Sequence, residues 1–508
     1  MNIRPAAPLL ASMTAAYALL SPQSAAQPEL AVFFGNLHSH TALSDGSGTP
    51  AEAYEHARDR AGLDFIALTE HNHAQAGDIA ENQALYTGPG SLALIPTAQR
   101  FLEAGAFLAL YGQEFSTISG GNHMNVIDAP QVIDVGNGDF RTLFESWLPA
   151  HPDTLGLPPL LILNHPSTSG SPSGLEYVID DYGGDTDAWL AAIDPRAELI
   201  NIINGPSHTE GTNQQPGTPS EGEFKRYLNL GLHVAPTADQ DNHKKNWGNA
   251  TEARTGVVAP VLTKAALLTA LRQRRAYATE DRNLRLVYQV NGRLLGGRIA
   301  GAAVPPPGTA LGISLQITDD DEPAAGYVVE VFSDQIGGPV AGAAVRTQSV
   351  AGNGTHAIAG VSYGGGDQYV YLRIRQDDGD RVWTAPVWLE PAGVPDVIDG
   401  DDEEGGESWS SSLSLSVDER AETAAITNDG TVPVELAGWK LVSVKGNQVF
   451  DQFPDGTIIA PGQTLIVTSG PGARTGAGFL RWTNQSMWSN SGDPGRLIDS
   501  DGNVVAED

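Results

Sequence analysis

The sequence predicts a multidomain protein in which an N-terminal α/β unit precedes two units built from β-strands. From residue 31 to 283, short apolar runs alternate with amphipathic stretches, which is typical of strands and helices in a barrel or a doubly wound sheet. From residue 284 to 391 the pattern changes to alternating β segments, and another β-rich unit spans 408–508. A chain of 508 residues has room for about three domains, each with its own core.

Residues 1–26 are predicted to be a secretory signal peptide. Arg4 supplies a positive charge, 6–20 form an apolar run, and Ser24-Ala25-Ala26 places small residues where a signal peptidase cleaves. A membrane anchor is the weaker interpretation, because the run is shorter than the roughly 20 residues that span a bilayer. We therefore expect an exported bacterial protein, periplasmic or extracellular, whose mature chain has no transmembrane segment.

The α/β unit contains two helices with clear start signals. The first begins after Thr49, where Glu52 completes a capping box, and ends at Gly62. Thr263 precedes a second helical run that extends to Arg275. The buried strands are predicted at 31–34, 64–68, 106–111, 160–163, 198–203 and 233–236.

Polar residues cluster where these strands end. Eleven of the twelve histidines lie between positions 38 and 243. The carboxyl ends of parallel strands share one edge of a sheet, so residues distant in sequence can meet in one pocket there. The chain has no cysteine, so metal ligands must be imidazole and carboxylate, a set that suits Zn, Mn or Fe. The candidate ligands are His38, His40, Asp45, His71, Glu114, His123, His165, Asp241 and His243.

Two pairs within this cluster have a spacing suited to one ion. His38 and His40 are two residues apart, as are Asp241 and His243. In extended backbone such residues point the same way and can reach the same ion. One pair alone is weak, but two pairs beside the other candidates indicate a metal site.

The cluster resembles the ligand set of the PHP (polymerase and histidinol phosphatase) superfamily. The resemblance implies a distorted (β/α)7 barrel over 31–283 that binds two or three divalent ions, Zn, Mn or Fe. The matching motifs are His38-Ser39-His40-Thr41-Ala42-Leu43-Ser44-Asp45-Gly46, Thr69-Glu70-His71-Asn72, Gly112-Gln113-Glu114, His123, Asn164-His165-Pro166 and Asp241-Asn242-His243. The implied ligand sets are His38, His40, Glu114 and Asp241 for a first ion, Glu114, His123 and His165 for a second, and Asp45, His71 and His243 for a third.

One departure from the family pattern narrows the resemblance. Glu70 stands where an aspartate is usual. With Trp247-Gly248, Arg254-Thr255-Gly256 and the run from Arg275 to Asp281, it resembles the carbaryl-hydrolase-like (CehA/McbA) branch. Members of that branch are not all phosphatases, so the resemblance leaves the substrate class open.

The expected chemistry is hydrolysis. A water between two divalent cations loses its proton near neutral pH and attacks phosphorus or a carbonyl carbon. We expect a phosphoesterase acting on a phosphomonoester or phosphodiester; an amide, ester or carbamate hydrolase with the same metals is the alternative. A non-enzymatic surface binding protein is a third interpretation. The one Gly-x-Ser-x-Gly run, at 360–364, lies in the β-rich region and is predicted to be a turn.

Three further residues are candidates for catalysis or substrate binding. His208 follows a strand end and could act as a general acid or contact the substrate; a loop histidine is the alternative. Arg254 and Arg275 could each bind a phosphate through two hydrogen bonds, and a structural role is the alternative for both.

The rest of the chain predicts β structure around an acidic linker. Alternating segments between Gly- and Pro-rich turns predict a small β-sandwich over 284–391. The run 392–407 is too acidic and Gly-rich to bury and is predicted to be a linker, with a calcium site as the alternative.

The C-terminal region, residues 408–508, contains several motifs with turn residues and aromatic or aliphatic positions. They include Leu436-Ala437-Gly438-Trp439-Lys440-Leu441, Phe453-Pro454-Asp455-Gly456 and Trp488-Ser489-Asn490-Ser491-Gly492-Asp493. With these motifs the region resembles a lamin-tail domain. The resemblance implies an immunoglobulin-like sandwich, often appended to secreted bacterial hydrolases, that could contact a surface or another protein.

The charge balance argues against one class of partner. The chain has 61 acidic and 29 basic residues and a net charge of −32, so its field opposes a polyanion such as duplex DNA. The lamin-tail-like region alone has six basic and twelve acidic side chains. Salt screens this field over about 10 Å, so a small anion can still bind at a metal centre. We expect a small anionic, phosphorylated substrate and no nucleic-acid scaffold role.

Overall fold

The computed structural model describes residues 30–72, 82–88, 93–115, 123–166, 181–340, 342–392, 413–430, 434–436, 438–451, 453–454, 457–459, 463–476, 478–490, 492–499 and 504–508. The predicted signal peptide at 1–26 lies outside these residues, as does all but the first residue of the predicted linker at 392–407.

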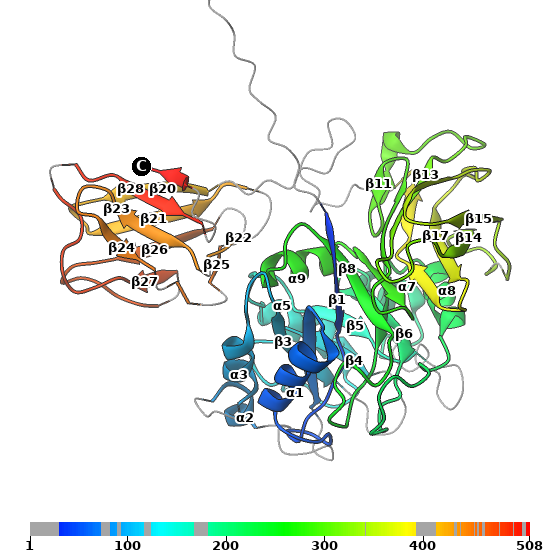
Figure 1. Ribbon diagram of the computed structural model, residues 1–508, viewed down its shortest axis with the longest axis horizontal. Coiled ribbons are helices and arrows are strands. Elements are labelled where there is room, and N and C mark those ends of the chain that lie inside the picture. The colour runs from blue at the N-terminus through cyan, green and yellow to red at the C-terminus, as the bar shows by residue number, and fades with distance from the viewer. Residues whose placement is uncertain are drawn as a thin grey trace, which may run out of the picture.

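The first unit is built around a buried sheet (Figure 1). Each strand predicted from an apolar run is present, and further strands occur at 124–127, 254–259 and 276–279. These three strands were not predicted from the sequence. The strands are β1 (Ala31–Asn36), β2 (Phe65–His71), β3 (Leu108–Phe115), β4 (Met124–Ile127), β5 (Leu160–Leu163), β6 (Ala197–Asn204), β7 (Ala235–Asp239), β8 (Arg254–Ala259) and β9 (Ala276–Thr279).

The sheet is mixed and not wholly parallel, whereas the alternation of strands and helices would imply parallel strands. Its hydrogen-bonded order is β9-β8-β1-β2-β3-β4-β5-β6-β7. β4 runs antiparallel to β3 and β5, and β8 runs antiparallel to β1 and β9. Beyond the strands, His40 N donates to Asn242 O at 2.8 Å, and Ala238 N of β7 donates to Thr255 Oγ1 of β8 at 3.0 Å. The sheet therefore curls until β7 approaches β8 and the segment after β1.

Both helix start signals are confirmed. Glu52 N donates to Thr49 Oγ1 at 3.2 Å, and Thr49 N donates to Glu52 Oε2 at 2.8 Å. The helix continues through a π-helical turn at Ala57–Ala61 and ends at Gly62, whose φ of +64° favours glycine. Thr263 caps the second helix, which ends at Arg272, before the predicted end. The helices of this unit include α1 (Pro50–His56), α2 (Gln83–Thr87), α3 (Leu94–Phe101), α4 (Phe140–Thr142), α5 (Leu148–Ala150), α7 (Thr186–Ile193), α8 (Glu221–Leu230) and α9 (Lys264–Arg272).

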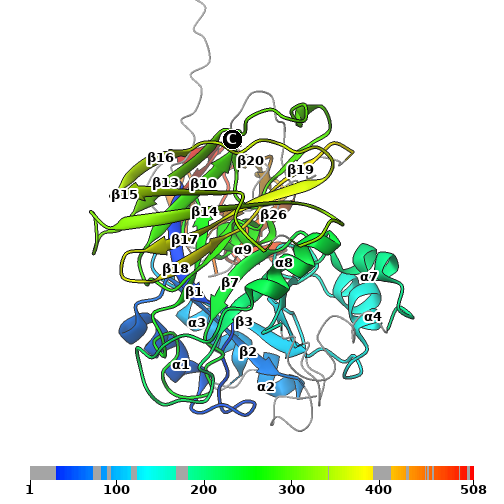
Figure 2. The ribbon, with the colours of Figure 1, turned by 90° about the vertical axis from the view of Figure 1, so that its right-hand side faces the viewer.

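The middle unit continues the same sheet and adds a second one (Figure 2). β18 pairs antiparallel with β9, so hydrogen bonding crosses the predicted boundary at residue 283. A second sheet, in the order β11-β10-β13-β16, packs against this extension through apolar side chains such as Leu315, Val329 and Leu372. The strands are β10 (Arg285–Val290), β11 (Arg293–Leu294), β12 (Arg298–Ala300), β13 (Ile313–Thr318), β14 (Gly326–Gln335), β15 (Arg346–Ala351), β16 (Gly354–Ile358), β17 (Gln368–Gln376), β18 (Arg381–Thr384) and β19 (Val387–Glu390).

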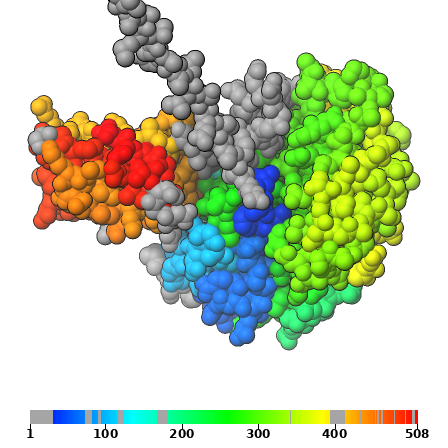
Figure 3. Space-filling view, turned by 45° about the horizontal axis from the view of Figure 1, so that its top comes forward, coloured from blue at the N-terminus to red at the C-terminus, as the bar shows by residue number. Residues whose placement is uncertain are grey.

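The C-terminal unit is a β-sandwich that forms a lobe of its own (Figure 3, orange to red). Sheets of order β20-β21-β26-β27 and β24-β23-β28-β29 enclose an apolar core that includes Ile426, Leu441 and Trp488. Lys264 N at the start of α9 donates to Glu435 Oε2 at 3.2 Å, which joins this unit to the first. The strands are β20 (Leu413–Asp418), β21 (Thr423–Asn428), β22 (Val434–Glu435), β23 (Lys440–Ser443), β24 (Gln448–Phe450), β25 (Ile458–Ile459), β26 (Thr464–Thr468), β27 (Phe479–Arg481), β28 (Gly495–Ile498) and β29 (Val504–Glu507).

Across the described residues, the helices are too short or too polar to cross a lipid bilayer.

Candidate metal centre

The predicted ligands meet at one edge of the first sheet. His38 and His40 follow β1, His71 ends β2, and Glu114 lies near the end of β3. His123 instead precedes a strand, β4. Because β4 is antiparallel to its neighbours, its amino end lies at the edge where the other strands have their carboxyl ends. The remaining candidates are His165 after β5, Asp241 and His243 after β7, and Asp45 in the turn after His40.

The first group of ligand atoms has the dimensions of a metal site. The Nε2 atoms of His38 and His40 lie 3.2 Å apart. Oε2 of Glu114 lies 3.2 and 3.3 Å from these nitrogens. Oδ1 of Asp241 lies 3.3 and 3.1 Å from the same two atoms. A tetrahedron with bonds of about 2.0–2.1 Å has edges of about 3.3–3.4 Å, so this group fits a tetrahedral Zn²⁺.

Glu114 joins the first group to a second. Its Oε2 lies 3.0 Å from Nδ1 of His71, and its Oε1 lies 3.0 Å from Nδ1 of His123 and 3.3 Å from Nε2 of His165. Asn164 Nδ2 donates to the same Oε1 at 2.9 Å. His71, Glu114 and His123 place their ligand atoms within 4.8 Å of one another. Glu114 therefore belongs to two groups; that it bridges two ions stays a prediction of the resemblance.

The third group differs from the implied assignment. His40, Asp45, His71 and His243 place ligand atoms within 4.8 Å of one another. Asp45 Oδ1 lies 3.2 Å from His243 Nε2 and 3.7 Å from His71 Nε2. His71 thus faces Glu114 with one nitrogen and Asp45 with the other. His40 and His71 each belong to two groups, whereas the resemblance placed each with a single ion.

Electrostatics keep the carboxylates of the site ionised. Burial alone would raise the pKa of Glu114, but the surrounding imidazoles hold it well below its usual value. For Asp45, His243 and His71 outweigh the same effect of burial and lower the pKa to about 2. Burial would lower the pKa of His38, but Glu114 and Asp241 raise it. The site therefore combines negative carboxylates with an imidazole, His38, that favours positive charge, whereas burial lowers the pKa of the His71 imidazole.

The backbone around the ligands is strained and is held by buried amides. Asp241 has a φ of +51° and His165 a φ of +26°, in a region that non-glycine residues rarely adopt and that is often found at functional sites. Asn242 Oδ1 accepts hydrogen bonds from Asn36 Nδ2 at 3.0 Å and from Gly248 N at 3.1 Å. Sequence reasoning quoted Asn242 within a motif but gave it no role. Its place between two predicted ligands was the available signal.

His208 lies beside this cluster, and its role in catalysis or substrate binding stays a prediction. Its ring centroid lies 4.2 Å from that of His243. Partial burial and the neighbouring His243 lower its pKa. His208 follows the Gly205–Pro206 segment, in the loop that separates β6 from α8.

The two predicted arginines are engaged elsewhere. Arg254 donates to the carbonyl oxygens of Ala61 at 2.8 Å and Arg282 at 3.4 Å, and none of these partners belongs to the cluster. Arg275 is buried and precedes the amino end of β9, which runs in the same direction as β1. It therefore lies at the edge of the sheet opposite the cluster. The structure does not bring Arg254 or Arg275 to the histidines, because Arg254 binds backbone carbonyls elsewhere and Arg275 lies before the amino end of β9.

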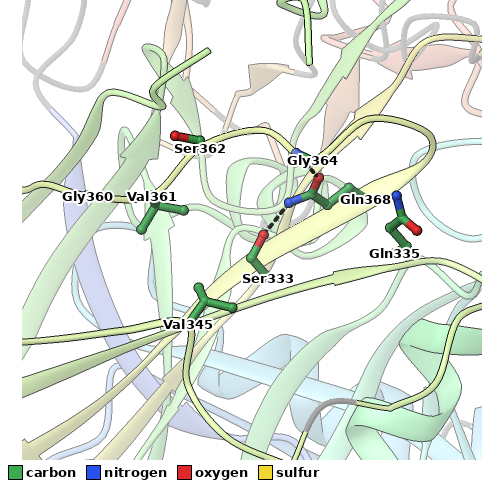
Figure 4. Close-up of a pocket in the computed structure, with 8 residues that line it drawn as sticks. All are labelled: Ser333, Gln335, Val345, Gly360, Val361, Ser362, Gly364 and Gln368. Atoms are coloured by element: carbon green, nitrogen blue, oxygen red, sulfur yellow. Dashed lines mark hydrogen bonds between the residues drawn. The ribbon is translucent and has the colours of Figure 1, made fainter. Parts of the chain in front are cut away.

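The Gly-x-Ser-x-Gly run borders a cavity of about 240 Å³ in the middle unit (Figure 4). Gly364 N donates to Gln368 Oε1 at 2.9 Å, and Gln368 Nε2 donates to Ser333 Oγ. No histidine lines this cavity in the described part of the chain, so Ser362 lacks a general base there. The lining residues are Ser333, Gln335, Val345, Gly360, Val361, Ser362, Gly364 and Gln368.

Comparison with known proteins identifies one domain. Residues 403–507 match the family model of the Lamin Tail Domain, which confirms the resemblance predicted for the C-terminal unit. No curated protein matches the chain.

Solved structures give weak likenesses. A two-domain protein from Bacteroides vulgatus containing a predicted PHP-like metal-dependent phosphoesterase is 14% identical, over 71% of this chain and 95% of that chain, with a TM-score of 0.35. A tetra-tandem repeat from the extending region of a large adhesion protein is 13% identical, over 46% and 54% of the two chains, with a TM-score of 0.14. Fibronectin(III)-like modules of CbhA from Clostridium thermocellum are 12% identical, over 44% and 90%, with a TM-score of 0.14. These TM-scores are too low to support a statement about function.

Proposed function

We propose that this protein is an exported, metal-dependent hydrolase of the PHP type, and that it acts on phosphomonoesters or phosphodiesters. The observation that carries the proposal is the convergence of three groups of ligand atoms that share His40, His71 and Glu114. Shared ligands require the groups to be adjacent, which is the arrangement of a multinuclear site. The curled sheet, with ligands at one edge, supports a distorted barrel of the PHP type.

The ligand set suits hydrolysis rather than structural metal binding. These imidazoles and carboxylates would hold divalent ions such as Zn, Mn or Fe, which would supply an activated water and positive charge for hydrolysis. Structural zinc sites are usually closed by four protein ligands at a single ion. Here several groups adjoin, and the side chains of two predicted ligands remain partly exposed: Asp45 to 44% and His165 to 27%. A substrate can therefore approach from that side.

His208 is our candidate for the residue that contacts the substrate. It neighbours His243 and belongs to none of the three ligand groups, so its ring is available to hydrogen-bond a leaving group or a substrate oxygen.

A second candidate function is hydrolysis of an amide, ester or carbamate at the same metals. It is favoured by the positions of Arg254 and Arg275, which do not reach the cluster and leave a phosphate without the two predicted partners. Glu70, the variant residue of the carbaryl-hydrolase-like branch, points to the same alternative.

A substrate panel separates these functions. Purified protein with added Mn²⁺ or Zn²⁺ should hydrolyse p-nitrophenyl phosphate or its bis ester; turnover of 1-naphthyl carbamate alone would favour the second candidate. Asp241→Asn and His71→Ala should remove activity while circular dichroism remains unchanged. Bound metal without turnover of any substrate would favour a surface binding protein, and normal activity in both variants would contradict the site assignment.

We also propose export through the signal peptide at 1–26, and a targeting or spacer role for the C-terminal domain. That domain has twice as many acidic as basic side chains, twelve against six, which disfavours contact with nucleic acid. A surface or protein partner remains the proposal for it.

A further inference from the structure

Glu70 is a buried carboxylate next to a predicted ligand, yet it faces away from the metal cluster. It precedes His71 on β2, and neighbouring strand residues point to opposite faces of the sheet. Its side chain has no exposed surface. Both carboxylate oxygens face the turn after β1, where they accept hydrogen bonds from Thr41 and Ser44.

These hydrogen bonds attach the whole turn to β2. Thr41 N lies 3.0 and 3.1 Å from the two oxygens of Glu70, and Thr41 Oγ1 donates at 2.6 Å. Ser44 Oγ donates to the second oxygen. The turn is therefore held at Thr41 and Ser44 by one residue.

The turn carries Asp45 and has little freedom of its own. Gly46 N donates to Thr41 O at 2.9 Å, and Ala42 N donates to Gly48 O at 2.8 Å. A Cβ on Gly46 would lie only 2.7 Å from the carbonyl carbon of His40, so the backbone is closely packed there. Asp45 follows Ser44 directly, and its position therefore depends on where Glu70 holds the turn.

His40, although adjacent to Thr41, is held independently. Its backbone N donates to Asn242 O at 2.8 Å, and its carbonyl accepts from Trp247 Nε1 at 2.8 Å. Loss of the Glu70 anchor should thus move Asp45 while leaving His40 in place.

We propose that Glu70 is a positioning residue that sets Asp45 for the group of His40, His71 and His243, and that its side-chain length matters. This inference rests on the proposed metal site. Aspartate at this position would withdraw the carboxylate by about 1.5 Å, the length of one carbon–carbon bond. Hydrogen bonds of 2.6–3.1 Å would then lengthen to about 4 Å or more, unless the backbone moved.

The test measures metal content and affinity in the full chain. Wild type, Glu70→Asp, Glu70→Gln and Asp45→Asn are titrated with Zn²⁺ against a chromophoric chelator, and bound metal is counted by mass spectrometry. We expect Glu70→Asp and Asp45→Asn to hold one ion fewer than wild type, or to bind that ion about 10–100-fold more weakly, as is typical when a residue supporting a ligand is lost. Glu70→Gln keeps the length and should lose less. Glu103→Asp, the same change at an exposed site, should match wild type.

Three results would overturn the inference. The first is an unchanged number and affinity of ions in Glu70→Asp while Asp45→Asn loses one. The second concerns Ser44→Ala, a milder change that removes one hydrogen bond between Glu70 and the turn and should weaken binding of the ion near Asp45 a few-fold. If Glu70→Asp loses every ion or the fold while Ser44→Ala binds metal like wild type, the inference is wrong. The third is a wild-type chain that binds no ion, which would also overturn the proposed function; the first two results leave that function intact.

Discussion

His233 links the first unit to the middle unit, and its replacement by glutamine should reduce stability in a pH-dependent way. Its Nδ1 lies 2.9 Å from Asp194 Oδ2, and its Nε2 lies 2.7 Å from Glu390 Oε1 on β19. Glu390 also accepts from Arg298 Nε at 2.7 Å. His233 is buried between two carboxylates. Glutamine would keep some hydrogen bonding but would remove the positive charge.

The size of the stability loss in His233→Gln can be estimated from the shifted pKa of Glu390. Burial would raise this pKa, but His233 and then Arg298 lower it from 4.5 to about 2. At about 1.4 kcal/mol per pKa unit, the shift of the Glu390 pKa corresponds to about 3 kcal/mol of folding stability. Because Arg298 causes part of this shift and solvent screens the charges, we assign about 1–2 kcal/mol of it to His233. The ion pair with Asp194 adds to this contribution. We therefore expect His233→Gln to lower the free energy of unfolding by about 3 kcal/mol, the lower end of the range for breaking a buried ion pair.

The sign of the pH dependence is set by both shifts. Burial would lower the pKa of His233, but its two carboxylate partners raise it above 6.5. Its contribution is therefore complete below pH 6.5 and is lost as pH rises through the higher folded-state pKa. The contribution of Glu390 is present above pH 4.5 and is lost as pH falls towards 2. The largest difference between wild type and His233→Gln is expected between pH 4.5 and 6.5.

Urea unfolding at pH 5.5 and pH 9 measures the difference in free energy of unfolding between wild type and His233→Gln. Comparison of the two proteins at each pH cancels the titration of the metal cluster, which both share. His356→Gln is the control, because the His356 ring is bound to the carbonyl of Gly352 at 3.0 Å instead of to carboxylates. A difference between wild type and His233→Gln that is equal at both pH values, or larger at pH 9, would refute the argument, since it would show that His233 acts by packing alone.

Three further predictions concern catalysis. Asp241→Asn should lower kcat at least about 100-fold, and removal of metal by a chelator should have a similar effect that added Zn²⁺ or Mn²⁺ reverses; retained activity after dialysis and metal analysis would contradict the site. His208→Gln should lower kcat about 10–100-fold with unchanged metal content, so a loss of bound metal would indicate a ligand role instead. Ser362→Ala and Arg254→Gln should leave KM within about twofold in steady-state assays, because Ser362 lacks a general base and Arg254 binds backbone carbonyls; a tenfold change in either would reopen its assignment.

Much of the local structure was predictable because its causes are local. Thr49, Glu52 and Gly62 mark the first helix through capping and a left-handed φ, which depend on residues a few positions apart. The apolar runs marked buried strands for the same reason. The collection of histidines at strand ends then followed from a general property of sheets, that neighbouring strand ends share one edge.

The direction of β4 could be decided only by tertiary structure, and it brings His123 to the cluster although this residue precedes its strand. The same holds for His71, which lies between two ligand groups, and for Glu70, which turns away to hold the loop of Asp45. Arg254 shows the converse, since its motif suggested a phosphate contact but its register gives it other partners. Capping and periodicity act over a few residues and can be read along the chain. Strand direction, ligand sharing and the partner of a long side chain depend on segments up to about 200 residues apart, such as Asn36 and Asn242, and arise only when those segments pack together.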